Sequence, residues 1–93
     1  MTSYTEAREY GDQVLTVNIS ETSARCPNCG RPTMLACWRK LRNGVEGARW
    51  AVWGECSECG ETVGCGSSPS MSSMEAETKV IEVASRERRE ARA

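Results

Sequence analysis

The sequence contains no His and no Phe, and among its 93 residues it has only three Trp and two Tyr. Without His, a His-based catalytic triad, a His general base and His metal ligands are all excluded. No run of residues approaches the ~18 consecutive apolar residues of a membrane-spanning helix. The first residues carry acidic side chains where a secretory signal would have an apolar segment. We therefore expect an intracellular, cytoplasmic protein that does not enter membranes.

A chain this short and polar can bury only a small hydrophobic core. Hydrophobic residues make up 39% of the sequence, and small domains of this kind seldom offset their conformational entropy by burial alone. The six Cys residues offer a further source of stability. Because no secretory signal is seen, a bound metal is expected in preference to disulfide bonds.

Charge is balanced overall but unevenly distributed along the chain. Twelve basic and thirteen acidic residues give a formal net charge of −1. Residues 25–50 hold six of the basic residues and a single acidic one, Glu46, whereas residues 1–24 and 51–66 are net acidic. This pattern differs from the uniformly basic surface of many nucleic-acid-binding proteins, but it places a basic segment in the middle of the chain.

Apolar and polar residues alternate at about residues 13–20, which predicts a half-buried strand, and further extended runs follow. We expect extended runs at about 13–20, 33–41 and 49–55, and one further short strand within the segment ETVGCG. The first dozen residues are expected to be loosely ordered. The pair Asn43-Gly44 predicts a hairpin turn, because type I′ turns need positive φ at both central residues.

The C-terminal part is expected to be a linker followed by a helix. Residues 66–73 are rich in Gly, Ser and Pro, as flexible linkers are. Ser72 is a good N-cap, and Glu75 is placed to complete a capping box. An apolar stripe follows at Ala76, Val80, Val83 and Ala84. We expect this stripe to dock on the strands, with a partner-binding or self-association face as the alternative.

Two CxxCG motifs carry the clearest chemical signal. They are Cys26-Pro-Asn-Cys29-Gly and Cys56-Ser-Glu-Cys59-Gly. Each motif is typical of a zinc knuckle, a tight turn that presents two thiolates to one ion. Four thiolates fill a tetrahedral zinc site and leave no position for an activated water, so we expect one structural Zn²⁺. Iron in a rubredoxin-like site or a pair of disulfides are the alternatives.

The two remaining cysteines lie outside these motifs. Cys37 falls in the middle of a predicted strand, where a buried small hydrophobe is the simplest interpretation. Cys65 is expected to be a plain thiol, although a substitute metal ligand or a redox partner of Cys37 is also consistent with its position. Nucleophilic catalysis is not expected of either residue, because the chain has no His to generate a thiolate.

A cluster of aromatic and basic residues lies on the two central predicted strands. Its members are Trp38, Arg39, Lys40, Arg42, Arg49, Trp50 and Trp53. Such residues contact phosphates and stack on bases, or serve as hot spots in protein interfaces. Trp50 and Trp53 differ by three positions and should point to opposite faces of their strand. At least one Trp is therefore expected to be exposed for binding.

These observations predict a small α+β zinc ribbon. The expected architecture is a β-hairpin or three-stranded antiparallel sheet with two zinc knuckles and a C-terminal helix. Residues 1–24 would form an N-terminal arm, residues 25–66 the four-cysteine ribbon, and residues 67–93 the Ser-rich linker and helix.

The order of these elements resembles the Lar family, small zinc-ribbon proteins of phages and prophages that are associated with alleviation of host restriction. The resemblance covers about residues 25–89. It rests on CPNCG, on RWAVWGECSECGE and on SMEAETKVIEVASRERR. It implies the four ligands Cys26, Cys29, Cys56 and Cys59, and it implies no catalytic residue.

We therefore expect a non-enzymatic protein, encoded by a phage or prophage, that binds and modulates a protein in the cytoplasm of a bacterial host. Antirestriction is the activity that the resemblance implies. The alternative is a nucleic-acid-binding ribbon that acts as a transcription or replication accessory factor. A third hypothesis, from the enzyme class, is a thiol redox protein that uses Cys37 and Cys65. No small-molecule substrate is expected.

Overall fold

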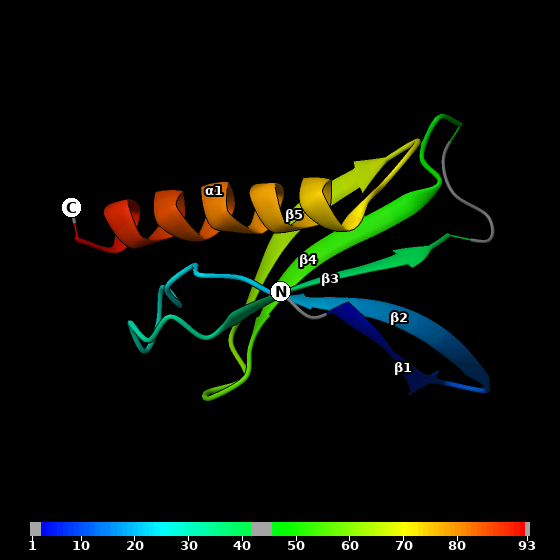
Figure 1. The fold of residues 1–93 in the computed structure, drawn as a ribbon, viewed down its shortest axis with the longest axis horizontal. Coiled ribbons are helices and arrows are strands. Elements are labelled where there is room, and N and C mark those ends of the chain that lie inside the picture. Colours follow the sequence, from blue (N-terminus) through cyan, green and yellow to red (C-terminus); the bar gives the residue numbers. More distant parts are fainter. Residues whose placement is uncertain (1–2, 42–45, 93) are drawn as a thin grey trace.

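The computed structural model describes residues 3–41 and 46–92, which form five strands followed by one helix (Figure 1). The elements are β1 (Ser3–Tyr10), β2 (Gln13–Glu21), β3 (Met34–Lys40), β4 (Trp50–Cys56), β5 (Thr62–Ser68) and α1 (Ser73–Arg92). The strands form a single antiparallel sheet in the order β1-β2-β3-β4-β5. The predicted α+β class is confirmed, but the sheet is larger than the hairpin or three strands that we expected.

The prediction of a loosely ordered N-terminus is wrong. Strand β1 pairs with β2 along its whole length, from Ser3 opposite Ser20 to Tyr10 opposite Gln13. Nearly all side chains of β1 are exposed, and neither apolar cluster contains a residue of this strand. Both of its faces therefore tolerate polar residues, and the alternation of apolar and polar residues that would predict a strand is missing.

The other predicted strands are confirmed to within about a residue at each end. Strands β2, β3 and β4 correspond to the three expected runs, and the segment ETVGCG opens β5. Strand β5 continues to Ser68, so the expected linker is shorter than residues 66–73. Asn43-Gly44, the predicted hairpin turn, lies outside the described residues.

Two apolar clusters form, one on each face of the sheet. The larger cluster lies between the sheet and α1 and contains buried residues of the strands, the helix and the first knuckle: Ala24, Cys26, Met34, Ala36, Trp38, Val52, Cys56, Val63, Ala76, Val80 and Ala84. The smaller cluster consists of Val17, Ile19 and Cys37, with Leu35 and Trp53 packed against it. Both clusters are small, as the composition predicts.

The sheet curves so that β1 approaches β4 on the face away from the helix. Arg8 of β1 donates to both carboxylate oxygens of Glu55 on β4, at 2.6 and 2.9 Å. In a flat sheet, β1 and β4 would be separated by two other strands and would lie ~14 Å apart, which is too far for direct contact. The β1–β2 hairpin therefore folds toward this face, and Figure 1 shows it on the opposite side of the sheet from α1.

Helix α1 begins and packs as the sequence predicts. The hydroxyl of Ser72 accepts a hydrogen bond from the backbone N–H of Glu75 at 3.2 Å, which confirms the N-cap. Ala76, Val80 and Ala84 are fully buried against the sheet. The apolar stripe is thus a docking face within the molecule.

Gly54 of β4 is surrounded by side chains of the helix-side core, and this position predicts a measurable effect. A Cβ atom there would lie 2.7 Å from Val63 Cγ2, 2.9 Å from Met34 Cε and 3.0 Å from Val80 Cγ1. We expect Gly54→Ala to destabilise the protein by about 1–3 kcal/mol, because overpacking forces neighbours out of place. Gly64→Ala is the matched control, since a Cβ there meets nothing within 4 Å. Equal unfolding midpoints of the two variants in urea would contradict this packing.

Candidate functional site

The two CxxCG motifs form turns with the same geometry. The carbonyl of Cys26 accepts from the N–H of Gly30 at 2.9 Å, and the carbonyl of Cys56 accepts from the N–H of Gly60 at 3.1 Å. Both glycines have positive φ, at 75° and 80°. This conformation is costly for residues with a Cβ atom, which explains why Gly closes both turns.

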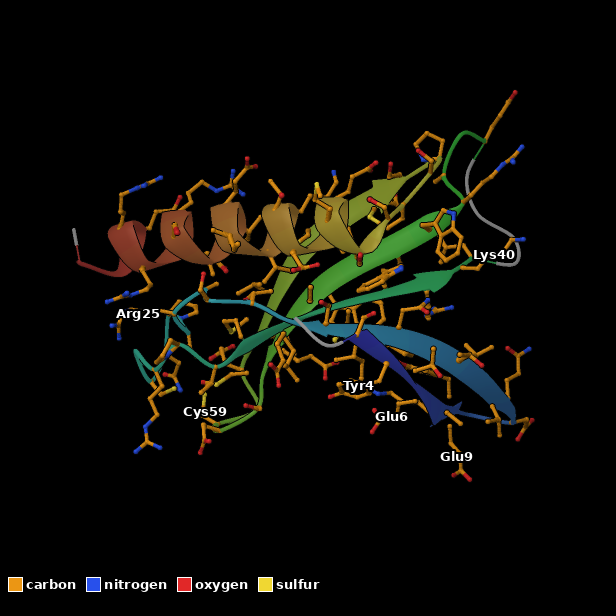
Figure 2. The ribbon with its side chains drawn as sticks, viewed as in Figure 1. Tyr4, Glu6, Glu9, Arg25, Lys40 and Cys59 are labelled. Carbon is orange, nitrogen blue, oxygen red and sulfur yellow. The ribbon has the colours of Figure 1, made fainter. Side chains whose placement is uncertain are left out.

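The sheet brings the two knuckles to the same end of the molecule. The first knuckle directly precedes β3, and the second connects β4 to β5. Met34, the first residue of β3, pairs with Cys56, the last residue of β4. Figure 2 shows Cys59 at this end, far from Lys40 at the other end of the sheet. The register of β3 with β4 therefore positions the four thiols.

The four sulfur atoms have the spacing of a single metal site. The Sγ atoms of Cys26, Cys29, Cys56 and Cys59 all lie within 4.8 Å of one another. The Cys26–Cys59 and Cys29–Cys56 separations are 3.5 and 3.7 Å. Zn–S bonds of ~2.3 Å in a tetrahedron place the sulfurs ~3.8 Å apart, whereas a disulfide needs ~2.05 Å. The donor set and its spacing fit one zinc ion, and all six cysteines are free thiols.

Hydrogen-bond donors surround the sulfurs. The backbone N–H of Asn28 donates to Cys26 Sγ at 3.3 Å, and the Asn28 side-chain amide donates to Cys59 Sγ at 3.6 Å. The Thr33 hydroxyl lies 3.1 Å from Cys56 Sγ. Burial raises the pKa of Cys56, but the Thr33 bond and two backbone amides outweigh it and lower that pKa to about 6. Burial dominates at Cys26 and raises its pKa to about 11.

A zinc ion bound here would offset two of the four thiolate charges at the margin of the core. Cys26 and Cys56 are buried and belong to the cluster beneath the helix, whereas Cys29 and Cys59 are exposed. The metal would therefore connect the two knuckles and, through their buried cysteines, the helix-side core. With four thiolate ligands its role would be structural.

The three Trp residues of the predicted binding cluster do not share a surface. Trp38 is 7% exposed and belongs to the helix-side core. Trp50 packs against that same core, whereas Trp53 packs against the smaller cluster on the other face. The predicted opposition of Trp50 and Trp53 is confirmed. The expectation of an exposed Trp is wrong, because Trp38 is buried and Trp50 and Trp53 are half-buried in the cores.

The basic residues of the cluster are also dispersed. Arg39 lies on the face away from the helix, with its guanidinium 5.3 Å from the centre of the Tyr10 ring. Lys40 is exposed at the end of the sheet remote from the knuckles. Arg49 is also exposed and directly precedes Trp50, the residue that pairs with Lys40. Arg42 lies outside the described residues. The cluster is therefore not one continuous aromatic and basic face over the described residues.

A hollow on the curved face includes residues that the sequence did not point to. The hollow has a volume of about 490 Å³. The residues that line it, which we call the concave face, are Arg8, Glu9, Tyr10, Arg39, Ala51, Trp53 and Glu55. The indole N–H of Trp53 donates to Glu55 at 2.6 Å, and Glu55 is held in turn by Arg8. Arg8 and Tyr10 come from β1, which was not predicted as a strand. No signal in the sequence alone indicates that this strand curls over β4.

The two additional cysteines lie on opposite faces of the sheet. Cys37 is fully buried in the smaller cluster, which confirms its interpretation as a small hydrophobe. Burial raises its pKa to about 12. Cys65 packs at the edge of the helix-side core, and burial raises its pKa as well. Neither thiol has the lowered pKa of a reactive cysteine, and the sheet separates them.

A scan against protein-family models finds no match for this chain, and searches of curated proteins and of solved structures find none either. The resemblance to the Lar family therefore rests on the motifs alone, and no family assignment follows. Within the described residues, no helix has an apolar stretch long enough to cross a membrane.

The Arg8–Glu55 pair predicts a pH-dependent contribution to stability. The hydrogen bonds from Arg8 lower the pKa of Glu55, burial opposes them, and Trp53 lowers this pKa further. A carboxylate whose pKa is lowered on folding stabilises the protein above its unfolded pKa of about 4.3 and loses that effect as pH falls through the folded pKa. We expect Glu55→Gln to cost about 1–2 kcal/mol at pH 7 and progressively less below pH 4.

Denaturant unfolding of the wild type and Glu55→Gln at a series of pH values would measure this difference. Glu9→Gln is the matched control, because Glu9 is an exposed carboxylate on the same strand as Arg8. A deficit of Glu55→Gln that did not shrink on acidification would show that the charge of Glu55 is not what stabilises the curved sheet.

Proposed function

We propose that this chain is a zinc-stabilised binding protein without catalytic activity, and that its concave face contacts a protein partner. The observation that carries the proposal is the combination of two features. One is a closed set of four thiols with zinc spacing, which suits a structural metal. The other is a hollow lined by Tyr10, Arg39 and Trp53 on the face that α1 leaves uncovered.

The chemistry of the concave face supports a protein partner. Tyr, Trp and Arg are the residues most enriched among interface hot spots. Both aromatic residues of the concave face are held in place. Arg39 lies over the ring of Tyr10, and Trp53 is hydrogen-bonded to Glu55. Side chains fixed in this way lose little conformational entropy on binding.

Mixed charge on the same face favours protein over nucleic acid. Glu55 and Glu6 both accept hydrogen bonds from Arg8, so carboxylates neutralise one of the two arginines there. A polyanion would meet these carboxylates directly. Lys40 and Arg49, which the nucleic-acid alternative would use, do not line this hollow.

The resemblance to the Lar family supplies a narrower form of the proposal. In this form the chain is encoded by a phage or prophage, its partner is a bacterial host protein, and binding relieves restriction. The four-thiol cluster supports only the shared zinc chemistry. Plating efficiency of unmodified phage on a restricting strain that expresses the chain tests this form separately from partner binding.

A capture experiment with charge-reversed variants tests the general proposal. The zinc-loaded protein would be immobilised and exposed to bacterial lysate with and without nuclease. We expect captured protein to survive nuclease, to be lost with Arg39→Glu and to be retained with Lys40→Glu, which makes the same charge change outside the concave face. Capture that nuclease abolishes, or that falls equally in both variants, would favour the nucleic-acid alternative. Near-ultraviolet circular dichroism checks that each variant is folded.

A further inference from the structure

A second hollow lies on the other side of the molecule, between α1 and the segment before the first knuckle. Its volume is about 320 Å³, and it is lined by Ser23, Ala24, Arg25, Ile81, Ser85, Arg88 and Arg89. Figure 2 shows Arg25 beneath the C-terminal half of α1. This arginine groove shares no residue with the concave face and takes no part in the function proposed above.

Three arginines converge on the groove from two separate elements. Ile81, Ser85 and Arg88 follow one another at four and three positions and so lie along one face of α1. Arg25 reaches the groove from the chain before the first knuckle, where its Nη1 donates to the carbonyl of Gly30 at 2.9 Å. The metal end of the molecule therefore holds Arg25 in position.

These guanidinium groups are not neutralised by carboxylates within the described residues. The ion pairs formed there involve Arg8 and Arg31. Arg25, Arg88 and Arg89 take part in none of them, although the chain is acidic overall. Two hydroxyls, of Ser23 and Ser85, add further hydrogen-bond donors to the same hollow. The groove is thus a concentrated site for an anion.

We propose that the arginine groove binds a short acidic segment of a protein. Guanidinium groups bind carboxylates in a bidentate manner, which gives both attraction and orientation. Ala24 and Ile81, the latter 39% exposed, supply an apolar wall for the aliphatic part of such a segment. The groove therefore combines positive charge with apolar surface.

The surroundings of the groove disfavour a nucleic-acid strand. A separate hollow beside the first knuckle is lined by Glu61 and Glu87 together with Pro27 and Asn28. Glu58 is also exposed at this end of the molecule, on the second knuckle. A continuous phosphate backbone running past the groove would meet these carboxylates, whereas a short acidic segment can end within it.

Amide chemical shifts of the full zinc-loaded chain would test this proposal. The probe is a capped hexapeptide, Glu-Glu-Leu-Glu-Glu-Leu, and the control peptide has Gln in place of each Glu. We expect shifts confined to residues 23–25 and 81–89 with the Glu peptide alone. We expect Arg88→Glu to weaken binding about tenfold or more, because it removes a charge-assisted contact and adds repulsion. Arg86→Glu, the same change outside the groove, should leave binding within about twofold.

Three outcomes would overturn the proposal. The first is equal binding of the Glu and Gln peptides. The second is equal weakening by Arg88→Glu and Arg86→Glu. The third is tighter binding at these residues of a six-nucleotide oligothymidylate than of the peptide, which would assign the groove to nucleic acid. Arg89→Glu provides a second variant if Arg88→Glu fails to fold.

Discussion

Cys56→Ser is expected to abolish stable zinc binding and to unfold the chain. The serine hydroxyl is a poor substitute for a thiolate, which is the ligand that zinc selects in closed structural sites. Structural zinc contributes an apparent ~10–16 kcal/mol in small zinc-binding domains, which exceeds the total stability of most domains of this size. The two apolar clusters are too small to compensate for a loss of that magnitude.

Because of the position of Cys56, we expect its replacement to destabilise the sheet and the helix-side core as well as the metal site. It is the last residue of β4, it pairs with Met34 at the start of β3, and its side chain is buried in the helix-side core. Loss of the metal there would leave buried thiols next to an unsupported end of the sheet. The second knuckle and the attachment of β5 would be lost together.

Circular dichroism and metal analysis of purified Cys56→Ser would measure this result. Cys65→Ser is the matched control, because it makes the same chemical change at a partly buried cysteine that is not a metal ligand. We expect the control to keep one zinc ion per chain and a native spectrum. A Cys56→Ser protein that kept a native spectrum without bound zinc would show that the metal does not hold the fold.

The second large effect is expected from Val80→Asp in the middle of α1. Val80 is fully buried, and its Cγ1 lies close to the backbone of Gly54 on β4. A carboxylate at this position would have no hydrogen-bond partner among the apolar residues of the cluster. Burying an unpaired charge costs several kcal/mol, so we expect the helix to detach from the sheet or the whole chain to unfold.

Met74→Asp provides the control for helix propensity and charge. Met74 lies on the first turn of the same helix and is 76% exposed, and an acidic residue near a helix N-terminus is favourable. Hydrogen exchange of the zinc-loaded variants would separate the two effects. We expect protection of α1 and of the core strands to fall in Val80→Asp and to be kept in Met74→Asp. Equal protection in both would contradict the docking of α1.

The CxxCG turns and the helix N-cap could be predicted, because each depends on interactions between residues that are close in the sequence. A CxxCG turn is specified within five residues, and the need for positive φ at Gly30 and Gly60 follows from the turn itself. Ser72 was identifiable as an N-cap for the same reason. The alternation in β2 follows from the burial of one of its faces, whereas the apolar run in β3 follows from the burial of both.

The concave face could not be predicted, because it depends on how distant strands curve. Arg8 and Glu55 are separated by 47 positions, and their contact requires an edge strand that has no apolar alternation. The separation of the aromatic and basic residues could not be predicted either, because it also depends on how the strands and the helix pack. The fold buries Trp38 beneath the helix and divides Trp50 from Trp53.

A zinc titration of the metal-free chain, followed by near-ultraviolet circular dichroism, tests the central claim most directly. The three Trp residues report tertiary packing on both faces of the sheet, since each contacts one of the two clusters. The account predicts a weak signal without metal and a cooperative gain that ends at one zinc ion per chain. A metal-free chain that already shows the full native signal, unchanged by zinc, would contradict it.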